Sequence, residues 1–83
     1  MVINVIDNDI DNGCAGMGDK CPIALAMQRN GCMYPSVGHR IAHYYDNTGK
    51  QIKGKLPSKA RDFMWKFDAG GQVSPFSFVL EPI

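Results

Sequence analysis

Two segments of the chain each begin with a proline and end at a glycine, and these signals predict two helices. The clearer segment runs from Pro57 to Ala69 and stops at Gly70-Gly71. Its apolar residues recur at the i, i+3, i+4 and i+7 positions of an amphipathic helix, and Ser58 can cap its first turn. These apolar residues are Ala60, Phe63, Met64 and Phe67. The segment therefore predicts a helix with one face in the core.

The other helical segment runs from Cys21 to Asn30, and Gly31 follows it as a terminating residue. Pro22 suits the first helical position, because its missing N–H would have no partner there anyway. Asp19 lies just before it and favours capping. Apolar side chains dominate the segment, so a mostly buried helix is predicted.

Four strands are predicted around these helices. Residues 2–6 are rich in Val and Ile, and residues 76–80 alternate between apolar and small or polar side chains. Ser36–Asp46 and Lys50–Leu56 read as two strands of a hairpin, because turn-forming residues fill the gap between them. Lys53 and Lys55 would lie on the outer face of this hairpin, where lysines blunt a sheet edge.

The resulting order, β-α-β-β-α-β, predicts an α+β fold. Its simplest packing places two helices on one face of a mostly antiparallel sheet. Asp7–Gly18 is rich in Asp, Asn and Gly, which predicts turns with a single helical turn at Asp9–Asn12. The 83 residues suffice for one domain, 1–83. A domain this small has a narrow margin of stability, so we expect a homo-oligomer.

The charge balance excludes some classes of partner. A net charge of +1 gives no long-range attraction to duplex nucleic acid or acidic membranes. No apolar run approaches the ~18 residues that a membrane helix needs, and residues 1–7 lack the basic start of a secretory signal. We therefore expect a cytoplasmic protein without a membrane partner. The odd number of cysteines, three, argues against a disulfide framework.

The glycine-rich segment Gly13–Lys20 resembles a phosphate-binding loop, because a helix N-terminus follows it. It departs from a Walker A loop, since Asp19 precedes Lys20 and Cys21 replaces the hydroxyl residue that would hold magnesium. The preceding Asp-rich segment resembles a calcium loop but lacks Gly at its sixth position and Glu at its twelfth. We expect a capping loop that can also admit an anion or a nucleotide-derived ligand.

The cysteines and histidines predict neither a metal site nor a resident cofactor. Cys14, Cys21, Cys32, His39 and His43 are separated by six, ten, six and three residues, without the close cysteine pair of structural zinc sites. His39 and His43 would share one strand face about 13 Å apart. An enzyme using Cys21 as nucleophile remains an alternative, because a helix N-terminus lowers a thiol pKa and either histidine could act as base.

Basic and aromatic residues gather on the predicted hairpin, including Arg40, Tyr44 and Tyr45. Such interleaving is typical of surfaces that bind single-stranded nucleic acid, and equally of protein interfaces. Trp65 lies off the apolar stripe of its helix, so it is either an exposed interface anchor or packed under a loop. Asp68, near the end of the same helix, is expected to accept hydrogen bonds from N–H groups in the Gly70-Gly71 turn, and the alternative is that it contacts a ligand.

Three segments resemble a family of small uncharacterised accessory proteins of tailed phages and prophages. They are Cys21-Pro22-Ile23-Ala24-Leu25-Ala26, Ser36-Val37-Gly38 and Phe67-Asp68-Ala69-Gly70-Gly71-Gln72-Val73-Ser74-Pro75-Phe76-Ser77-Phe78. The resemblance extends over nearly the whole chain. It implies a phage protein acting in the host cytoplasm, where such proteins often antagonise host defence by covering a host protein or by binding nucleotide immune signals without cleaving them.

The function expected from these features is a non-enzymatic, phage-type binding protein. As a host-defence antagonist it would sequester a nucleotide-derived immune signal, and the expected ligand contacts are Lys20, Cys21, His39, Arg40 and Tyr44. The alternative is a protein–protein inhibitor of a host or phage protein, acting through Trp65, Lys53 and Lys55. A small enzyme that depends on Cys21 is the third hypothesis.

Overall fold

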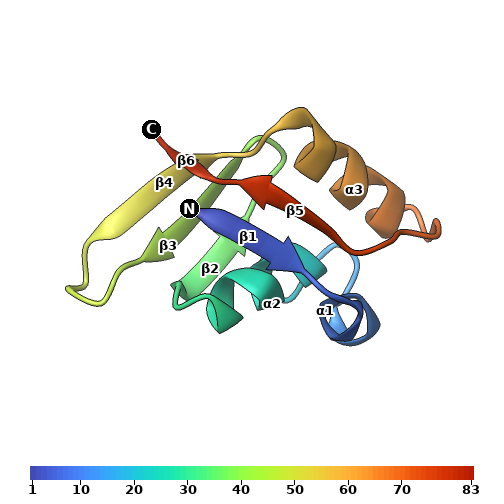
Figure 1. Ribbon diagram of the computed structural model, residues 1–83, viewed down its shortest axis with the longest axis horizontal. Helices are drawn as coiled ribbons and strands as arrows, with labels where there is room; N and C mark the ends of the chain where they lie inside the picture. The colour runs from blue at the N-terminus through green and yellow to red at the C-terminus, as the bar shows by residue number, and fades with distance from the viewer.

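The computed structural model describes residues 1–83, which form three helices and six strands (Figure 1). Most predicted elements are present, and two further strands and one further helix join them. In chain order, the elements are β1 (Val2–Val5), α1 (Asp7–Asn12), α2 (Pro22–Arg29), β2 (Met33–Val37), β3 (Ile41–Tyr45), β4 (Gln51–Lys55), α3 (Ser58–Asp68), β5 (Phe76–Val79) and β6 (Glu81–Pro82).

The strands form two antiparallel sheets where the sequence suggested one. β1 pairs with β5 in a two-stranded sheet, and the other four strands follow the order β2-β3-β4-β6. The chain passes from one sheet to the other at Leu80, a buried residue between β5 and β6 whose N–H donates to the Met1 carbonyl at 2.8 Å. The mixed α+β class is confirmed, with the sheet divided in two.

The predicted strand Ser36–Asp46 is wrong as a single element, because the chain turns back within it. Gly38 N–H donates to the Ile41 carbonyl at 2.9 Å, which closes a tight turn between β2 and β3. Within β3 the side chains alternate between two faces: Ala42 and Tyr44 are buried, whereas Ile41 and Tyr45 are exposed. The sequence prediction treated residues 36–46 as one continuous strand and therefore placed no turn within them.

The hairpin of β3 and β4 is confirmed. Ile41 pairs with Lys55 and Tyr45 pairs with Gln51. In the connecting turn, the Asp46 carboxylate accepts hydrogen bonds from the Thr48 hydroxyl and from the N–H groups of Thr48 and Lys50. These hydrogen bonds lower the pKa of the Asp46 carboxyl, and the bond from the Thr48 hydroxyl has the largest effect.

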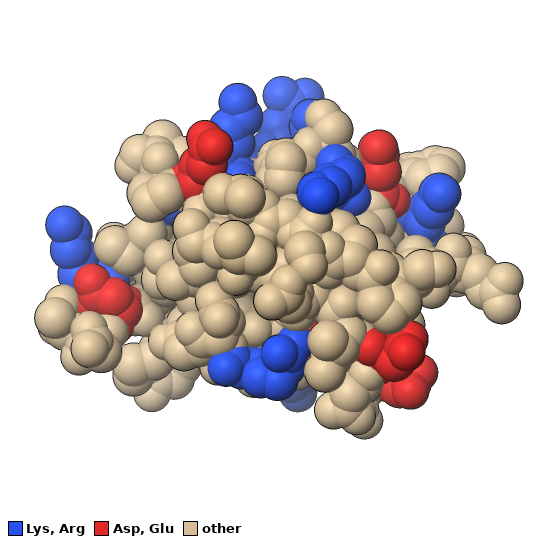
Figure 2. All heavy atoms as spheres, viewed as in Figure 1, with Lys and Arg blue, Asp and Glu red and all other residues tan.

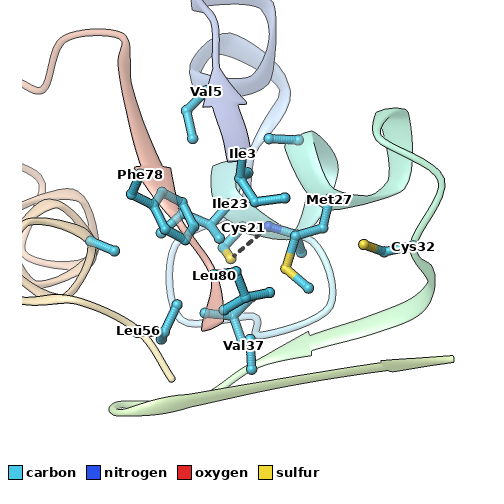
Figure 3. Close-up of a cluster of buried hydrophobic side chains, with 14 of the residues drawn as sticks. Ile3, Val5, Cys21, Ile23, Met27, Cys32, Val37, Leu56, Phe78 and Leu80 are labelled. Carbon is cyan, nitrogen blue, oxygen red and sulfur yellow. Dashed lines mark hydrogen bonds between the residues drawn. The ribbon is translucent and has the colours of Figure 1, made fainter. Parts of the chain in front are cut away.

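Helix α2 begins at Pro22 as predicted, but Cys21 caps it in place of Asp19. The Cys21 Sγ accepts a hydrogen bond from Ala24 N–H at 3.4 Å, the dashed line in Figure 3. Gly31 follows the helix with φ of +92°, a conformation that glycine adopts without strain. The helix thus lies within the predicted segment Cys21–Asn30, and the two end residues of that segment are its caps.

Helix α3 also has the predicted position, but its N-terminus differs in detail. Pro57 occupies the capping position and provides no side-chain cap, whereas the predicted cap, Ser58, accepts a hydrogen bond from Arg61 Nη2 at 3.1 Å. Ala60 and Phe63 are buried as expected of the apolar stripe. Phe63 also packs against Phe76 of β5, which joins α3 to the smaller sheet.

Helix α1 extends over Asp7–Asn12, where the sequence suggested turns with one helical turn. Asp9 within it is buried at 4% exposure. Its carboxylate accepts hydrogen bonds from Ile6 N–H and from Arg29 Nη2, the latter at 2.6 Å as an ion pair. This pair fastens α1 to the end of α2.

The core lies between α2 and the two sheets. Figure 3 shows Ile3 of β1, Phe78 of β5 and Leu80 pointing toward Cys21 at the start of α2, with Val37 and Leu56 beside them. All these side chains are buried. The helices are short, and none has the length and apolar character needed to cross a membrane.

Candidate functional site

The glycine-rich loop before α2 connects two distant elements. Gly16 N–H donates to the Asp68 carboxylate at 3.0 Å, and the Gly18 carbonyl accepts from Val37 N–H at 2.8 Å. The prediction that Asp68 serves the Gly70-Gly71 turn is therefore wrong. Backbone carbonyls satisfy the N–H groups of that turn instead, as in the 2.8 Å bond from Gly71 N–H to the Lys66 carbonyl.

A hollow of about 850 Å³ opens where this loop, the β2–β3 turn and α3 meet; we call it the Trp65 hollow. The loop contributes Gly16–Gly18 and the turn contributes Val37–His39. Helix α3 contributes Ser58, Arg61, Asp62, Met64, Trp65 and Asp68. Two residues singled out from the sequence for different roles, His39 and Trp65, thus line the same hollow.

Trp65 is 75% exposed, which decides between its two predicted positions. It is not packed under a loop, so most of its indole remains open to solvent. An exposed tryptophan beside a hollow offers a flat apolar face for an aromatic ring to stack against. The surrounding carboxylates, imidazole and guanidinium supply both hydrogen-bond donors and hydrogen-bond acceptors.

A second hollow of about 620 Å³ lies between the start of α3 and strands β5 and β6; we call it the basic hollow. Its cationic side chains are Lys55, Lys59 and Arg61, and Glu81 is its only carboxylate. Figure 2 shows Lys and Arg side chains gathered along the upper edge of the molecule, above the place where α3 begins in Figure 1. The two hollows therefore differ in charge.

Arg61 lines both hollows, and sequence reasoning did not single it out. Its Nε is buried without a hydrogen-bond partner, while its Nη2 donates to Ser58 Oγ. A signal was available in the sequence. Residues Ser58, Arg61, Trp65 and Asp68 follow the i, i+3, i+7, i+10 spacing of one helical face, and all four line the Trp65 hollow.

The other predicted ligand contacts lie away from this hollow. Lys20 and Arg40 are exposed, but neither lines either hollow. Tyr44 is buried on β3, and burial is the main cause that raises its pKa, ahead of the neighbouring Cys32 and Asp46. Of the five predicted ligand contacts, only His39 lines a hollow.

Cys21 is fully buried, so its thiol has no direct access to a ligand. Burial raises the pKa of this thiol and outweighs the hydrogen bonds from the start of α2, which lower it. The sequence had suggested the opposite shift. All three cysteines are free thiols, and no cluster of three His, Cys, Asp or Glu side chains is placed to hold a metal ion.

The lysines proposed for a protein interface are divided by the fold. Lys55 lines the basic hollow, whereas Lys53 lies outside both hollows. Strand β4 is not a free edge along its whole length, because Gly54 and Lys55 pair with β6. The Lys53 carbonyl also accepts a hydrogen bond from Ile83 N–H at 2.9 Å. An incoming strand could pair freely only with the first part of β4.

Comparison with protein-family models, curated proteins and solved structures gives no match to this chain.

Proposed function

We propose that the chain is a non-enzymatic binding protein that sequesters a small nucleotide-derived ligand in the Trp65 hollow. The observation that carries the proposal is the exposed indole of Trp65 beside His39 and Arg61. Stacking of a base on an aromatic side chain contributes about 1–3 kcal/mol. The polar groups around it can then bind base edges or sugar hydroxyls.

The acidic groups of the hollow fit a ribose better than a phosphate. Asp62 and Asp68 both line it, and a carboxylate is a common partner of ribose hydroxyls. Asp68 already accepts a hydrogen bond from Gly16 N–H through one oxygen, which leaves its other oxygen for a ligand. The hydrogen bond between Gly16 and Asp68 also holds the glycine-rich loop against α3, and the Trp65 hollow lies between these two elements.

Binding without turnover is supported by the position of Cys21, the one nucleophile that the sequence suggested. Its thiol is enclosed by the core and its pKa is raised, so the reactive thiolate is disfavoured. The segments that resemble phage accessory proteins support a role as a host-defence antagonist. In that role the protein would act in the host cytoplasm, as a homo-oligomer, on a nucleotide immune signal.

The test is direct measurement of nucleotide binding by calorimetry and thermal shift. The panel contains adenosine, ADP, ADP-ribose and cyclic dinucleotides, and mass spectrometry examines what co-purifies from cells with active nucleotide-signalling defence. Trp65→Ala is expected to weaken binding about tenfold or more. Tyr34→Ala is the matched control, because Tyr34 is equally exposed, at 78%, and lines neither hollow. Absence of binding by every nucleotide and nucleoside would contradict the proposal.

A second candidate is a protein–protein inhibitor, favoured by an exposed aromatic pair on the larger sheet. Tyr34 and Tyr45 make an edge-to-face contact with ring centroids 6.3 Å apart, and Met33 beside them is exposed. Tyr34 has φ of +50°, a conformation that disfavours a bulky side chain. A pull-down with wild-type, Tyr34→Ala and Trp65→Ala proteins separates the two candidates. A specific partner lost only with Tyr34→Ala favours inhibition through this pair.

A further inference from the structure

The charges of the two hollows are distributed unequally. The basic hollow has three cationic side chains and one carboxylate, whereas the Trp65 hollow has the two carboxylates Asp62 and Asp68 and one guanidinium. An anion would therefore be attracted to the first and repelled from the second. A neutral base or sugar would be subject to neither effect.

Arg61 connects the two hollows physically. It lines both of them, and its Nε is buried without a hydrogen-bond partner in the protein. That nitrogen is itself enclosed, so a ligand would contact the other guanidinium nitrogens, and these can bind a phosphate with several donors at once. Ser58, which accepts a hydrogen bond from Arg61, also lines both hollows.

The basic hollow also lies at the start of α3, an 11-residue helix. Its capping residue, Pro57, offers no side-chain acceptor to the first N–H groups of the helix. A bound anion would supply that acceptor and interact favourably with the helix dipole. This contribution adds to the attraction of Lys55, Lys59 and Arg61.

We propose that the basic hollow is a phosphate subsite, so that one ligand bridges the two hollows. Its base stacks on Trp65, and its phosphate groups bind Lys55, Lys59 and Arg61. This inference rests on the proposed function for the Trp65 hollow. It narrows the ligand class to phosphorylated nucleotides, because a nucleoside would leave the basic hollow without an occupant.

The experiment measures binding of adenosine, ADP and pyrophosphate by calorimetry at low salt. The test variant is Lys55→Gln with Lys59→Gln. The matched control is Lys50→Gln with Lys53→Gln, which removes the same charge from β4 and the turn before it, outside both hollows. ADP affinity is expected to fall at least about tenfold in the test variant. Adenosine affinity should stay unchanged, and the control should match wild type.

Glu81 provides a test of opposite sign. It is the carboxylate of the basic hollow, so Glu81→Gln is expected to raise ADP affinity about threefold by removing a repulsion. Lys59→Gln alone should lower it. A variant that merely disturbed the fold would not increase ADP affinity. If the double lysine variant is unstable, the opposite changes expected of Glu81→Gln and Lys59→Gln still test the phosphate subsite.

The outcomes separate this inference from the proposed function. If adenosine and ADP bind equally and the lysine variants change neither affinity, the phosphate subsite is refuted and the Trp65 hollow stands. If pyrophosphate binds through the lysines but adenosine does not bind and Trp65→Ala leaves ADP affinity unchanged, the phosphate subsite stands and the proposed function falls. If none of the three probes binds, the phosphate subsite is refuted, and the proposed function falls as well if ADP-ribose and the cyclic dinucleotides also fail to bind.

Discussion

Gly16 and Asp68 lie 52 residues apart in the chain, and the backbone N–H of the first donates a hydrogen bond to the carboxylate of the second at 3.0 Å. The bond joins the glycine-rich loop to the last turn of α3. Both residues line the Trp65 hollow, so the same contact that orders the loop also shapes the candidate site.

Replacement of Asp68 is therefore expected to loosen the loop with a modest effect on stability. Asp68→Ala should lower the free energy of unfolding by about 0.5–1.5 kcal/mol, the usual contribution of one hydrogen bond. Urea denaturation measures that loss, and hydrogen exchange measures protection of the Gly16 amide. Asp62→Ala is the control, since Asp62 lines the same hollow on the same helix. Equal hydrogen exchange of the Gly16 amide in Asp68→Ala and Asp62→Ala would show that Asp68 does not hold the loop in place.

The ion pair between Arg29 and Asp9 is expected to stabilise the N-terminal part of the fold. Arg29→Met would leave the Asp9 carboxylate buried with only Ile6 N–H as partner. Because the Arg29 side chain is 45% exposed, we expect a loss of about 2 kcal/mol, below that of a fully buried pair. Urea denaturation gives the value, and Arg40→Met is the exposed-cation control.

The neutral variant Asp9→Asn checks the cause of that loss. In the Arg29→Met background it removes the unpaired charge while keeping an oxygen that can accept from Ile6 N–H. It should recover part of the lost stability. The ion-pair account fails if Arg29→Met is as stable as Arg40→Met.

The two long helices could be predicted because their signals are local. Proline at the start, glycine at the end and an apolar stripe all lie within the segment itself, as in Ser58–Asp68. The division of the strands into two sheets could not be predicted in the same way. It depends on pairing between β1 and β5, which come from opposite ends of the chain. The turn at Gly38 was missed because alternation continues across it.

The candidate site was predictable only in part, for a similar reason. Trp65 was recognised because it departs from the apolar stripe of its own helix, and the Gly13–Lys20 loop because glycines cluster there. The contact of that loop with Asp68 is a tertiary relationship with no signal in either segment. Burial of Cys21 likewise follows from packing against Ile3 and Phe78, which outweighs the effect of the helix N-terminus on its thiol.

Gly54 is expected to tolerate no larger side chain, because Leu80 occupies the adjacent space. A Cβ at Gly54 would lie 2.5 Å from Leu80 Cγ and 2.6 Å from Cδ1. Gly54→Ala should therefore cost about 1–3 kcal/mol of unfolding free energy, as overpacking does. In a Leu80→Ala background the same substitution should cost less, since the clashing atoms are absent. Additive losses in a double-mutant cycle would show that this contact is not the cause.

The three thiols are expected to differ sharply in reactivity, because only Cys14 is exposed. A thiol reagent at neutral pH should modify Cys14 at once, and Cys21 and Cys32 only through opening of the structure. Burial is the main cause that raises the pKa of both buried thiols above that of the unfolded chain. Modification is followed by mass spectrometry, with Cys14→Ser as the control, and equal rates at all three thiols would contradict the burial of Cys21 and Cys32.

The same pKa shifts predict how stability depends on alkaline pH. The folded state keeps the Cys21 and Cys32 protons where the unfolded chain releases them, so the unfolded state binds fewer protons. The contribution of these thiols is fully present below the unfolded pKa of about 8.5 and is lost as pH rises toward the folded values. Urea midpoints should therefore fall between neutral pH and pH ~10, and less steeply in Cys32→Ala than in wild type. An unchanged slope in Cys32→Ala would show that another group causes the decline.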